Sequence, residues 1–315
     1  GRQAGRRAHY PPLPLLEDEE VIQEQPDQTA LTERYTERCV RFIRHNRDRP
    51  FFLYMAHMHV HLPYYAAPRF MKNSRNGPYG ACVEAIDWST GVLLWELKRL
   101  GLDDKTLVLF TSDNGSRGDR GGSNGPLNGR KGTTWEGGQR VPLIARFPGV
   151  VPAGSVCSEM ALAMDFLPTL AALAGASPPS DRIIDGKNIW PLFCGEEGAR
   201  SPHDAFFYYR CDALQAVRSG KWKLHVWRDQ GPVQELYDLS EDIGETRNLY
   251  SQHPDVVRRL MEKVEACRED LGDAALGRVG KNIRPIGRVE NPAPLTQYNP
   301  DHPYIEAEYD LSEAG

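Results

Sequence analysis

The stretch 106–115, TLVLFTSDNG, joins a short apolar run directly to an acidic and an amide side chain. Its first part, Thr106 to Thr111, is typical of a strand that is covered on both faces of a sheet. Asp113 and Asn114 follow at the carboxyl end of that strand. Ligands of open α/β sheets bind beyond the carboxyl ends of the strands, so this junction is the first candidate site.

The same strand and helix alternation continues on both sides of this stretch. Apolar runs at 51–56 and 141–147 predict two further buried strands. Apolar residues at helical spacing predict one helix that starts at Thr32 and a second from about Tyr79 to Leu100, which Gly101 should end. Asp165 is expected to cap a further helix. This order favours an α/β fold with a mostly parallel sheet flanked by helices.

The pattern changes after about residue 198. Four short strands with turns between them, and a helix over 254–267, predict a small antiparallel sheet with one helix. Ser219, Gly220 and Lys221 are a candidate hairpin turn. The expected organisation is therefore a partial catalytic domain at 1–198, an antiparallel subdomain at 199–272 and an extended tail at 273–315.

Composition excludes several classes of protein. Across 315 residues, 40% are hydrophobic and 26% are charged, which suits a chain with a full core. The 38 Lys and Arg against 43 Asp and Glu give a net charge of −5. The chain therefore lacks the excess of basic residues that would indicate nucleic acid binding. No apolar run approaches the roughly 20 residues of a transmembrane helix. The six cysteines are scattered without a zinc-binding spacing.

Asp113 and Asn114 offer adjacent hard oxygen ligands, which suit Ca²⁺ or Mg²⁺ better than zinc. An ordinary Asp-Asn-Gly turn explains the same tripeptide equally simply. A second candidate is Lys131, which lies in the glycine-rich stretch 129–138. Glycines let the backbone approach a ligand closely, and the lysine supplies a compact positive charge for an anion. A solvated lysine on a flexible loop is the alternative.

Three histidines, His57, His59 and His61, alternate along the chain and would face one side of an extended segment. No fourth ligand lies near them in the sequence. We therefore expect one functional histidine and two that pack against neighbours.

Together these elements resemble the sulfatase family of the alkaline-phosphatase-like superfamily, and most of all its arylsulfatase A and galactosamine-6-sulfatase branch. The resemblance covers residues 10–272. It rests on matching stretches in the same order: Arg49 to Tyr54, His61-Leu62-Pro63, Gly80 to Gly91 with Asp87-Trp88-Ser89, Thr106 to Gly115, Gly129 to Pro142, Asp165 to Leu170 and Leu236 to Leu239.

The resemblance implies a sulfuric ester hydrolase with a Ca²⁺-assisted formylglycine mechanism, and Mg²⁺ is a possible substitute. It implies that Asp113 and Asn114 are metal ligands, that Lys131 contacts a sulfate oxygen, and that His61 lies near the leaving-group oxygen. The implied partner is a sulfate ester of an aryl, carbohydrate or glycolipid compound. A secreted, periplasmic or lysosomal location follows only by analogy.

The chain also departs from the family pattern. Sulfatases form the formylglycine in Cys-x-Pro-Ser/Ala-x-Arg, and no cysteine here has a proline two residues on. Ser177 to Arg182 imitates the serine version but lies after the Asp-Asn motif, on the wrong side of it. The expectation is therefore the C-terminal part of a sulfatase, which is inactive alone. The alternatives are a non-catalytic sulfatase-like binding module and a phosphodiesterase of the same superfamily.

Overall fold

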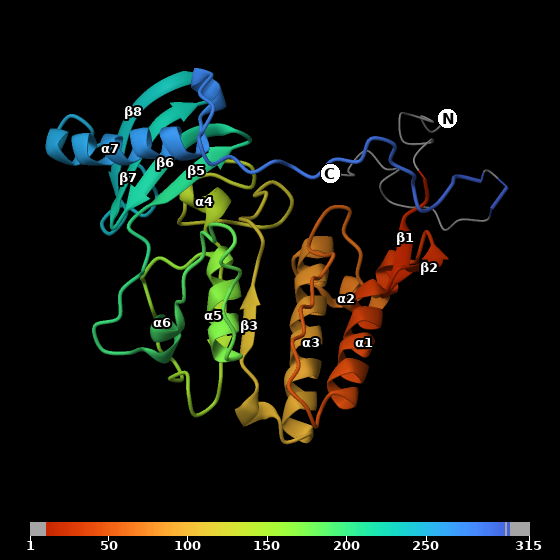
Figure 1. Cartoon of the computed structure of the whole chain (residues 1–315). Coiled ribbons are helices and arrows are strands. Elements are labelled where there is room, and N and C mark those ends of the chain that lie inside the picture. The colour runs from red at the N-terminus through yellow and green to blue at the C-terminus, as the bar shows by residue number, and fades with distance from the viewer. Residues whose placement is uncertain (1–10, 300, 303–315) are drawn as a thin grey trace. The chain divides into compact units, whose positions relative to one another are not determined.

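The computed structural model describes residues 11–299 and 301–302. Contacts divide the chain into two units (Figure 1). Unit 1 consists of Gly1–Asp103 and Ile286–Gly315, and unit 2 is Asp104–Pro285. The domain boundaries that the sequence predicted at 198 and 272 are not tested by this division and stay a prediction. Residues 1–10, and residues 300 and 303–315 of the predicted tail, lie outside the described residues.

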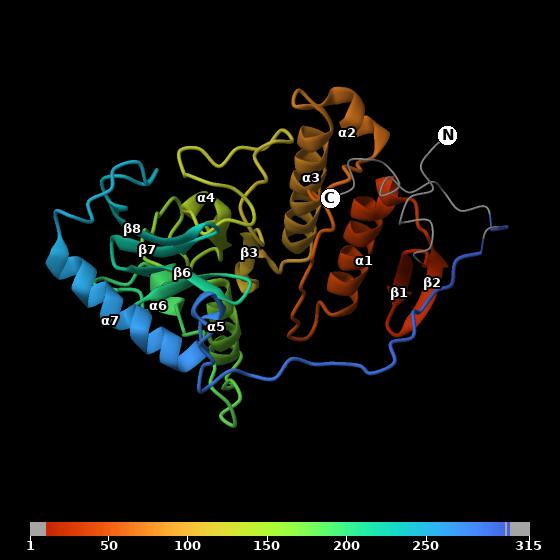
Figure 2. The ribbon, with the colours of Figure 1, turned by 90° about the horizontal axis from the view of Figure 1, so that it is seen from above.

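Unit 1 is built on two long helices, α1 (Leu31–His45) and α3 (Gly77–Arg99), which lie side by side in Figures 1 and 2. Both predicted helices are confirmed. Their contact includes a buried hydrogen bond of 2.6 Å between the Thr36 and Ser89 hydroxyl groups. Gly101 follows α3 at φ +69°, the left-handed conformation that ends a helix. The remaining elements are the hairpin β1 (Pro14–Glu17) and β2 (Glu20–Glu24), a 3₁₀ turn (Gln28–Ala30) and α2 (Pro68–Asn73).

The predicted buried strand at 51–56 is not a strand in the structure. This segment has no strand partner among the described residues, and Phe52 and Tyr54 are 71% and 80% exposed. The exposure alternates along the segment, as it would in a strand, but a strand needs a neighbour to accept and donate its backbone hydrogen bonds. An apolar run alone therefore overstated the burial.

The strand that precedes the Asp-Asn motif forms as β3 (Val108–Thr111), in unit 2. It pairs with β4 (Leu143–Arg146), which confirms the third predicted strand. The pair is antiparallel, with Val108 opposite Arg146, and the parallel pairing that the sequence predicted is not observed. The strand–helix order indicated parallel neighbours, but the long glycine-rich connection returns the chain beside β3 in the opposite direction.

Asp165 precedes α5 (Phe166–Leu173) but does not cap it through its side chain, which corrects the prediction. The carboxylate is fully buried and accepts hydrogen bonds from the backbone N–H groups of Leu162 and Lys187, each at 2.8 Å. The His203 ring lies 2.7 Å away. Asp165 thus joins three separate segments, which its sequence neighbours could not reveal.

The antiparallel sheet predicted in the C-terminal part is confirmed. It has the order β5-β6-β7-β8: β5 (Phe206–Arg210), β6 (Ala213–Ser219), β7 (Trp222–Arg228) and β8 (Gly231–Asp238). The β6–β7 hairpin turns at Gly220, where φ is +57°. Helix α7 (Pro254–Leu271) crosses one face of this sheet (Figure 1). Its buried residues Val256, Val257, Leu260 and Val264 join Leu214, Leu224 and Leu236 in the main apolar core.

Short elements complete the fold: 3₁₀ turns at Asp103–Lys105, Ala163–Asp165 and Ala274–Leu276, and the helices α4 (Glu136–Gln139) and α6 (Trp190–Cys194). Within unit 1, the Thr296 hydroxyl donates a hydrogen bond of 2.5 Å to the Pro12 carbonyl. In the part of the chain that the structure describes, no helix combines the length and the apolar character needed to cross a membrane.

Candidate functional site

Asp113 and Asn114 lie in a turn directly after β3. Asp113 is exposed, and its Oδ1 accepts the Asn114 backbone N–H at 2.9 Å. Asn114 is half-buried and donates through Nδ2 to the Gly115 carbonyl at 3.1 Å. Asn114 Oδ1 and the second carboxylate oxygen of Asp113 therefore retain capacity to bind a ligand.

Lys131 lies in the glycine-rich stretch 129–138, the Lys131 loop, which contacts this turn. Its backbone N–H donates to the Ser116 carbonyl at 3.0 Å, and the Gly115 N–H donates to the Gly138 carbonyl at 3.1 Å. A Cβ on Gly115 would lie only 1.8 Å from the Gly137 carbonyl oxygen, so the two backbones touch where a side chain cannot fit. The structure thus brings the backbones of the Asp113–Asn114 turn and the Lys131 loop together.

Asn124 ties these two segments to each other. Its side-chain oxygen accepts the Ser116 N–H at 2.7 Å, and its Nδ2 donates to the carbonyls of Ser116 and Gly129 at 2.7 and 3.2 Å. The Asn124 side-chain amide thereby forms hydrogen bonds with backbone groups that have no partner in a helix or strand. Residues 115–135 are irregular, as predicted, but α4 begins at Glu136, within the stretch that was expected to be loop.

His61 lies in unit 1, is exposed, and has its Nδ1 2.6 Å from the Leu62 carbonyl. His59 is buried, and burial lowers the pKa of its ring. His57 is half-buried, and the expectation that one of the three histidines is functional stays a prediction. The convergence of His61 with Asp113, Asn114 and Lys131, which belong to unit 2, stays a prediction.

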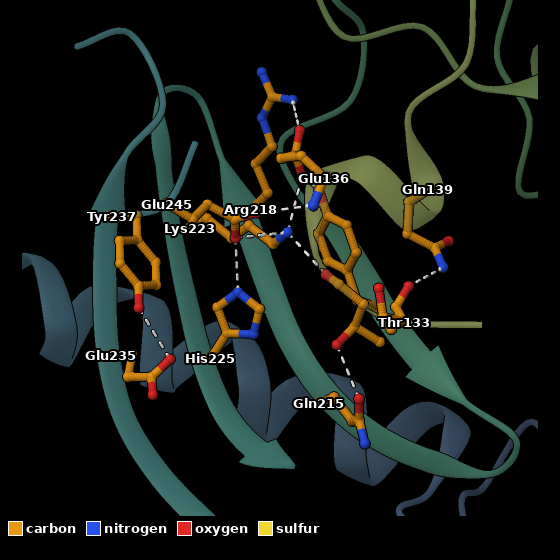
Figure 3. A network of polar contacts seen from close by, with 12 residues as sticks. Thr133, Glu136, Gln139, Gln215, Arg218, Lys223, His225, Glu235, Tyr237 and Glu245 are labelled. Atoms are coloured by element: carbon orange, nitrogen blue, oxygen red, sulfur yellow. Dashed lines mark hydrogen bonds and ion pairs between the residues drawn. The ribbon is translucent and has the colours of Figure 1, made fainter. Parts of the chain in front are cut away.

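A buried charged cluster lies beside the Lys131 loop, and sequence reasoning missed it. Figure 3 shows Glu136 on α4 facing Lys223 and His225 on β7, with α7 behind the sheet. Lys223 Nζ lies 2.9 Å from Glu136 Oε1 and 3.0 Å from Glu245 Oε1. Lys223, His225 and Glu245 are 0–2% exposed. The cluster is thus a group of charges that have been removed from water.

Further hydrogen bonds reach the Glu136 carboxylate. The Tyr208 hydroxyl donates to Glu136 Oε1 at 2.8 Å, and Arg218 reaches Glu136 Oε2 at 3.3 Å. Burial raises the pKa of the Glu136 carboxyl, but Lys223, Tyr208 and Arg218 together outweigh this effect and the net pKa is lowered. Burial is also the main reason that the pKa of His225 is lowered. The cluster thus places the carboxyl groups of Glu136 and Glu245 beside Lys223 and Arg218, and the lowered pKa of His225 favours its neutral ring.

The sequence did contain one signal for this cluster. In β7, Lys223 and His225 alternate with Leu224 and Val226. Leu224 and Val226 face the α7 core, and alternating polar residues usually face solvent. Here the Lys131 loop covers that second face, so the polar residues are buried too. Residues distant in the chain, the segment 134–136 and Glu245, explain this burial, and local periodicity carries no information about them.

Comparisons with known proteins decide the family. A family model described as Sulfatase matches residues 8–176, more than half of the chain. The chain belongs to the sulfatase family. A second family model, described as N-sulphoglucosamine sulphohydrolase, C-terminal, matches residues 130–270. The expected resemblance is therefore confirmed at the level of the family.

Curated relatives of this sulfatase-family chain are similar over most of its length. Steryl-sulfatase of Mus musculus is 39% identical over 80% of this chain and 46% of its own length. Arylsulfatase A of Homo sapiens is 38% identical over 90% of this chain and 61% of its own. N-acetylgalactosamine-6-sulfatase of Canis lupus familiaris is 41% identical, covering 69% and 44%. The chain spans about half the length of these relatives.

Solved structures support the same α/β fold. One titled as Ps i-CgsB in complex with k-i-k-neocarrahexaose matches with a TM-score of 0.72 and 30% identity, covering 86% of this chain and 60% of that chain. The PsFucS1 sulfatase from Pseudoalteromonas sp. matches with a TM-score of 0.71 and 25% identity, covering 79% and 55%.

The donor set at the Asp113–Asn114 turn fits a hard cation in kind, since it offers carboxylate and amide oxygens. It is incomplete in number, because Ca²⁺ takes about 6–8 oxygen ligands. Within the described residues, no three His, Cys, Asp or Glu side chains gather closely enough to hold a metal ion. A complete calcium site would need oxygen ligands beyond this turn.

Proposed function

We propose that this chain is the C-terminal part of an arylsulfatase-type sulfuric ester hydrolase that carries the anion-stabilising half of the active site. The observation that carries the proposal is the joining of the Asp113–Asn114 turn to the Lys131 loop through Ser116, Gly115 and Gly138. A hard-cation ligand pair and a lysine thereby belong to one hydrogen-bonded loop system. The substrate would be a sulfate ester of an aryl, carbohydrate or glycolipid compound.

Each residue has a definite role in this proposal. Sulfate oxygens and the leaving-group oxygen gain negative charge as the S–O bond breaks. Lys131 would bind a sulfate oxygen through its ammonium group, and His61 would donate a proton or a hydrogen bond to the leaving-group oxygen. Both act by stabilising charge that is larger in the transition state than in the bound ester.

Asp113 and Asn114 would hold Ca²⁺, or Mg²⁺ in its place, and the ion would polarise the sulfate when bound. With only these two side chains, the chain alone should bind Ca²⁺ no better than about millimolar, since water would fill most positions. Calorimetry with CaCl₂ on the 315-residue chain measures this. A micromolar dissociation constant that Asp113→Ala abolishes would mean that further ligands exist within this chain.

The nucleophile is proposed to lie outside these 315 residues. None of the six cysteines is followed by proline at the second position, and the matched relatives are about twice as long. A formylglycine in an upstream segment would supply the attacking group. Lys131 and His61 can stabilise charge but cannot replace a nucleophile. A secreted, periplasmic or lysosomal location is part of the same proposal.

The test is turnover of a chromogenic aryl sulfate, with and without coexpressed formylglycine-generating enzyme. We expect no turnover by the 315-residue chain and turnover by a protein extended upstream through the formylglycine segment. Steady release of the aryl alcohol by the 315-residue chain, lost in Lys131→Ala, would contradict the proposed division of the site. An inactive extended protein that still binds sulfate esters would instead favour a non-catalytic binding module.

The phosphodiesterase alternative has less support. A two-zinc relative would need paired Asp and His ligands, whereas an exposed Asp next to an Asn follows β3 here. The same assay run with an aryl phosphate diester distinguishes the two activities.

A further inference from the structure

The buried cluster contacts the backbone of the Lys131 loop as well as its side chains. Lys223 Nζ donates to the Thr134 carbonyl at 2.8 Å. Glu245 Oε2 accepts the Glu136 backbone N–H at 2.8 Å. These two contacts hold the peptide groups on either side of Trp135, at fixed positions relative to β7. The loop is thus fastened by directional bonds and not by apolar packing alone.

Side chains of the loop reinforce the same attachment. The Thr134 hydroxyl donates to Gln215 Oε1 on β6 at 2.8 Å. The Trp135 ring lies 4.7 Å from the His225 ring and 3.6 Å from the Arg228 guanidinium carbon. Residues 134–136 therefore contact both central strands of the sheet, as Figure 3 shows for Gln215, Lys223 and His225.

Lys131 itself lacks such support at its side chain. The side chain is exposed, and its ammonium group forms no ion pair with any residue that the structure describes. Its position depends on the backbone, which Ser116 holds at Lys131 and which the cluster holds three to five residues further on. Gly129 and Gly132, on either side of Lys131, have φ values of +80° and +83°. Residues with side chains rarely adopt this conformation, so the two glycines allow the backbone to turn tightly around Lys131.

The composition of the cluster also points to positioning. Buried ion pairs often stabilise a fold no better than apolar residues of the same size, because removing charges from water costs free energy. What buried ion pairs add is a defined geometry, because each carboxylate oxygen and each N–H group holds one partner in a fixed position. Here Glu136 and Glu245 are matched by Lys223 and Arg218, and the bonds that they direct end on loop residues.

We propose that Lys223, Glu136 and Glu245 are positioning residues that set the location of Lys131 relative to the sulfate group, an inference that rests on the proposed function. They touch neither substrate nor reacting atoms. They act by fixing residues 134–136 to β7, and hence the turn that carries the lysine. Loss of one member would release the loop while the sheet and α7 remain folded.

The first test uses the 315-residue chain alone and does not depend on activity. Amide hydrogen exchange is measured for wild type, Lys223→Met, Glu245→Gln and the matched control Lys221→Met. Lys221 lies in the same hairpin and pairs with Asp238 at 2.6 Å. In the two cluster variants, exchange of amides 131–138 should accelerate at least about tenfold more than exchange of the central amides of β6 and β7. The control should leave the loop as in wild type.

Glu245→Gln keeps the size of the side chain and answers the question even if Lys223→Met does not fold. Unchanged loop exchange in a folded cluster variant would overturn the inference. Acceleration spread evenly over the sheet would overturn it as well, because it would mean that the cluster only stabilises the fold.

The second test is a double-mutant cycle in the upstream-extended protein with an aryl sulfate. Glu245→Gln should lower kcat about tenfold with KM changed less than about twofold. In the Lys131→Ala background, the same substitution should lower kcat less than about twofold, since the group being positioned is gone. Equal effects in both backgrounds would overturn the proposal. If the extended wild type shows no turnover, the proposed function fails, and hydrogen exchange alone decides whether the cluster holds the loop.

Discussion

Unit 2 contains two charged regions that are joined by one loop and differ in how far their charged groups are exposed and paired. Asp113 and Lys131 are exposed, and the Lys131 ammonium group has no ion-pair partner among the described residues. Glu136, Lys223 and Glu245 are buried and bonded to one another. Charges that already satisfy each other stabilise a conformation, and charges without protein partners can bind a ligand. The comparison separates residues that maintain the site from residues that would perform its chemistry.

The largest effect on stability should follow from breaking the buried region. Lys223→Ala removes the cation that pairs with both Glu136 and Glu245, and only Arg218 remains beside Glu136. The free energy of unfolding of unit 2 should therefore fall by about 3–5 kcal/mol. Urea denaturation followed by far-UV circular dichroism measures it. Lys131→Ala is the matched control and should change stability by less than about 0.5 kcal/mol. Similar losses in both variants would remove the distinction between the two regions.

The exposed region should show the reverse pattern. In the upstream-extended protein, Lys131→Ala should lower kcat on the order of 10²–10³-fold, the usual result of removing one group that stabilises developing oxyanion charge. Its unfolding transition should coincide with that of wild type. Activity within about threefold of wild type would contradict the assignment of Lys131 to the sulfate group.

The backbone contact between the Asp113–Asn114 turn and the Lys131 loop can be tested at Gly115. A methyl group there meets the Gly137 carbonyl at 1.8 Å, so Gly115→Ala must force the two backbones apart. We expect a stability loss of about 1–3 kcal/mol, as for overpacked sites. Gly91→Ala is the control, since nothing lies within 4 Å of its added Cβ on α3. Gly91→Ala should raise the free energy of unfolding by about 0.5–1 kcal/mol. A Gly115→Ala variant with unchanged stability would contradict the close contact between the two backbones.

A smaller effect should appear as a pH dependence of unit 1, where Glu96 repeats the buried arrangement. Hydrogen bonds from Arg44 and then Arg99 lower the pKa of its carboxyl from 4.5 to about 2. A carboxyl with a lowered folded-state pKa stabilises the fold above its unfolded pKa and loses that contribution as the pH falls. The window therefore runs from about pH 4.5 down to about 2.

Thermal denaturation across that window should show a smaller decline of Tm for Glu96→Gln than for wild type. The control is Glu37→Gln, which removes an exposed carboxylate from the same helix pair and should keep the wild-type decline. Parallel curves for all three proteins would show that the two arginines do not act on Glu96 as the structure indicates.

Much of the local structure could be predicted from the sequence. The apolar positions Val256, Val257, Leu260 and Val264 recur at helical spacing and are all buried in α7. Gly101 ends α3, and Gly220 makes the β6–β7 turn. These features depend on a residue and its near neighbours in the chain. The Asp113–Asn114 and Lys131 motifs, which are proposed to bind ligands, were also found in this way, because each is recognised from its near neighbours, a strand end or flanking glycines.

Other features were decided by tertiary structure alone. The run 51–56 has the composition of a buried strand, yet it has no strand partner among the described residues, and Phe52 and Tyr54 are exposed. Asp165 is placed like a cap, yet it binds Leu162, Lys187 and His203.

The sequence by itself thus determined the longer helices α1, α3, α5 and α7, most strands, the family and the residues proposed for chemistry. Tertiary structure decided which way β4 runs, and it decided that Lys223 and His225 are buried instead of solvated. The physical reason is range. Helical spacing, turn glycines and apolar runs act over a few residues, whereas the burial of Lys223 depends on Glu136 and Glu245, 87 residues before it and 22 after it in the chain.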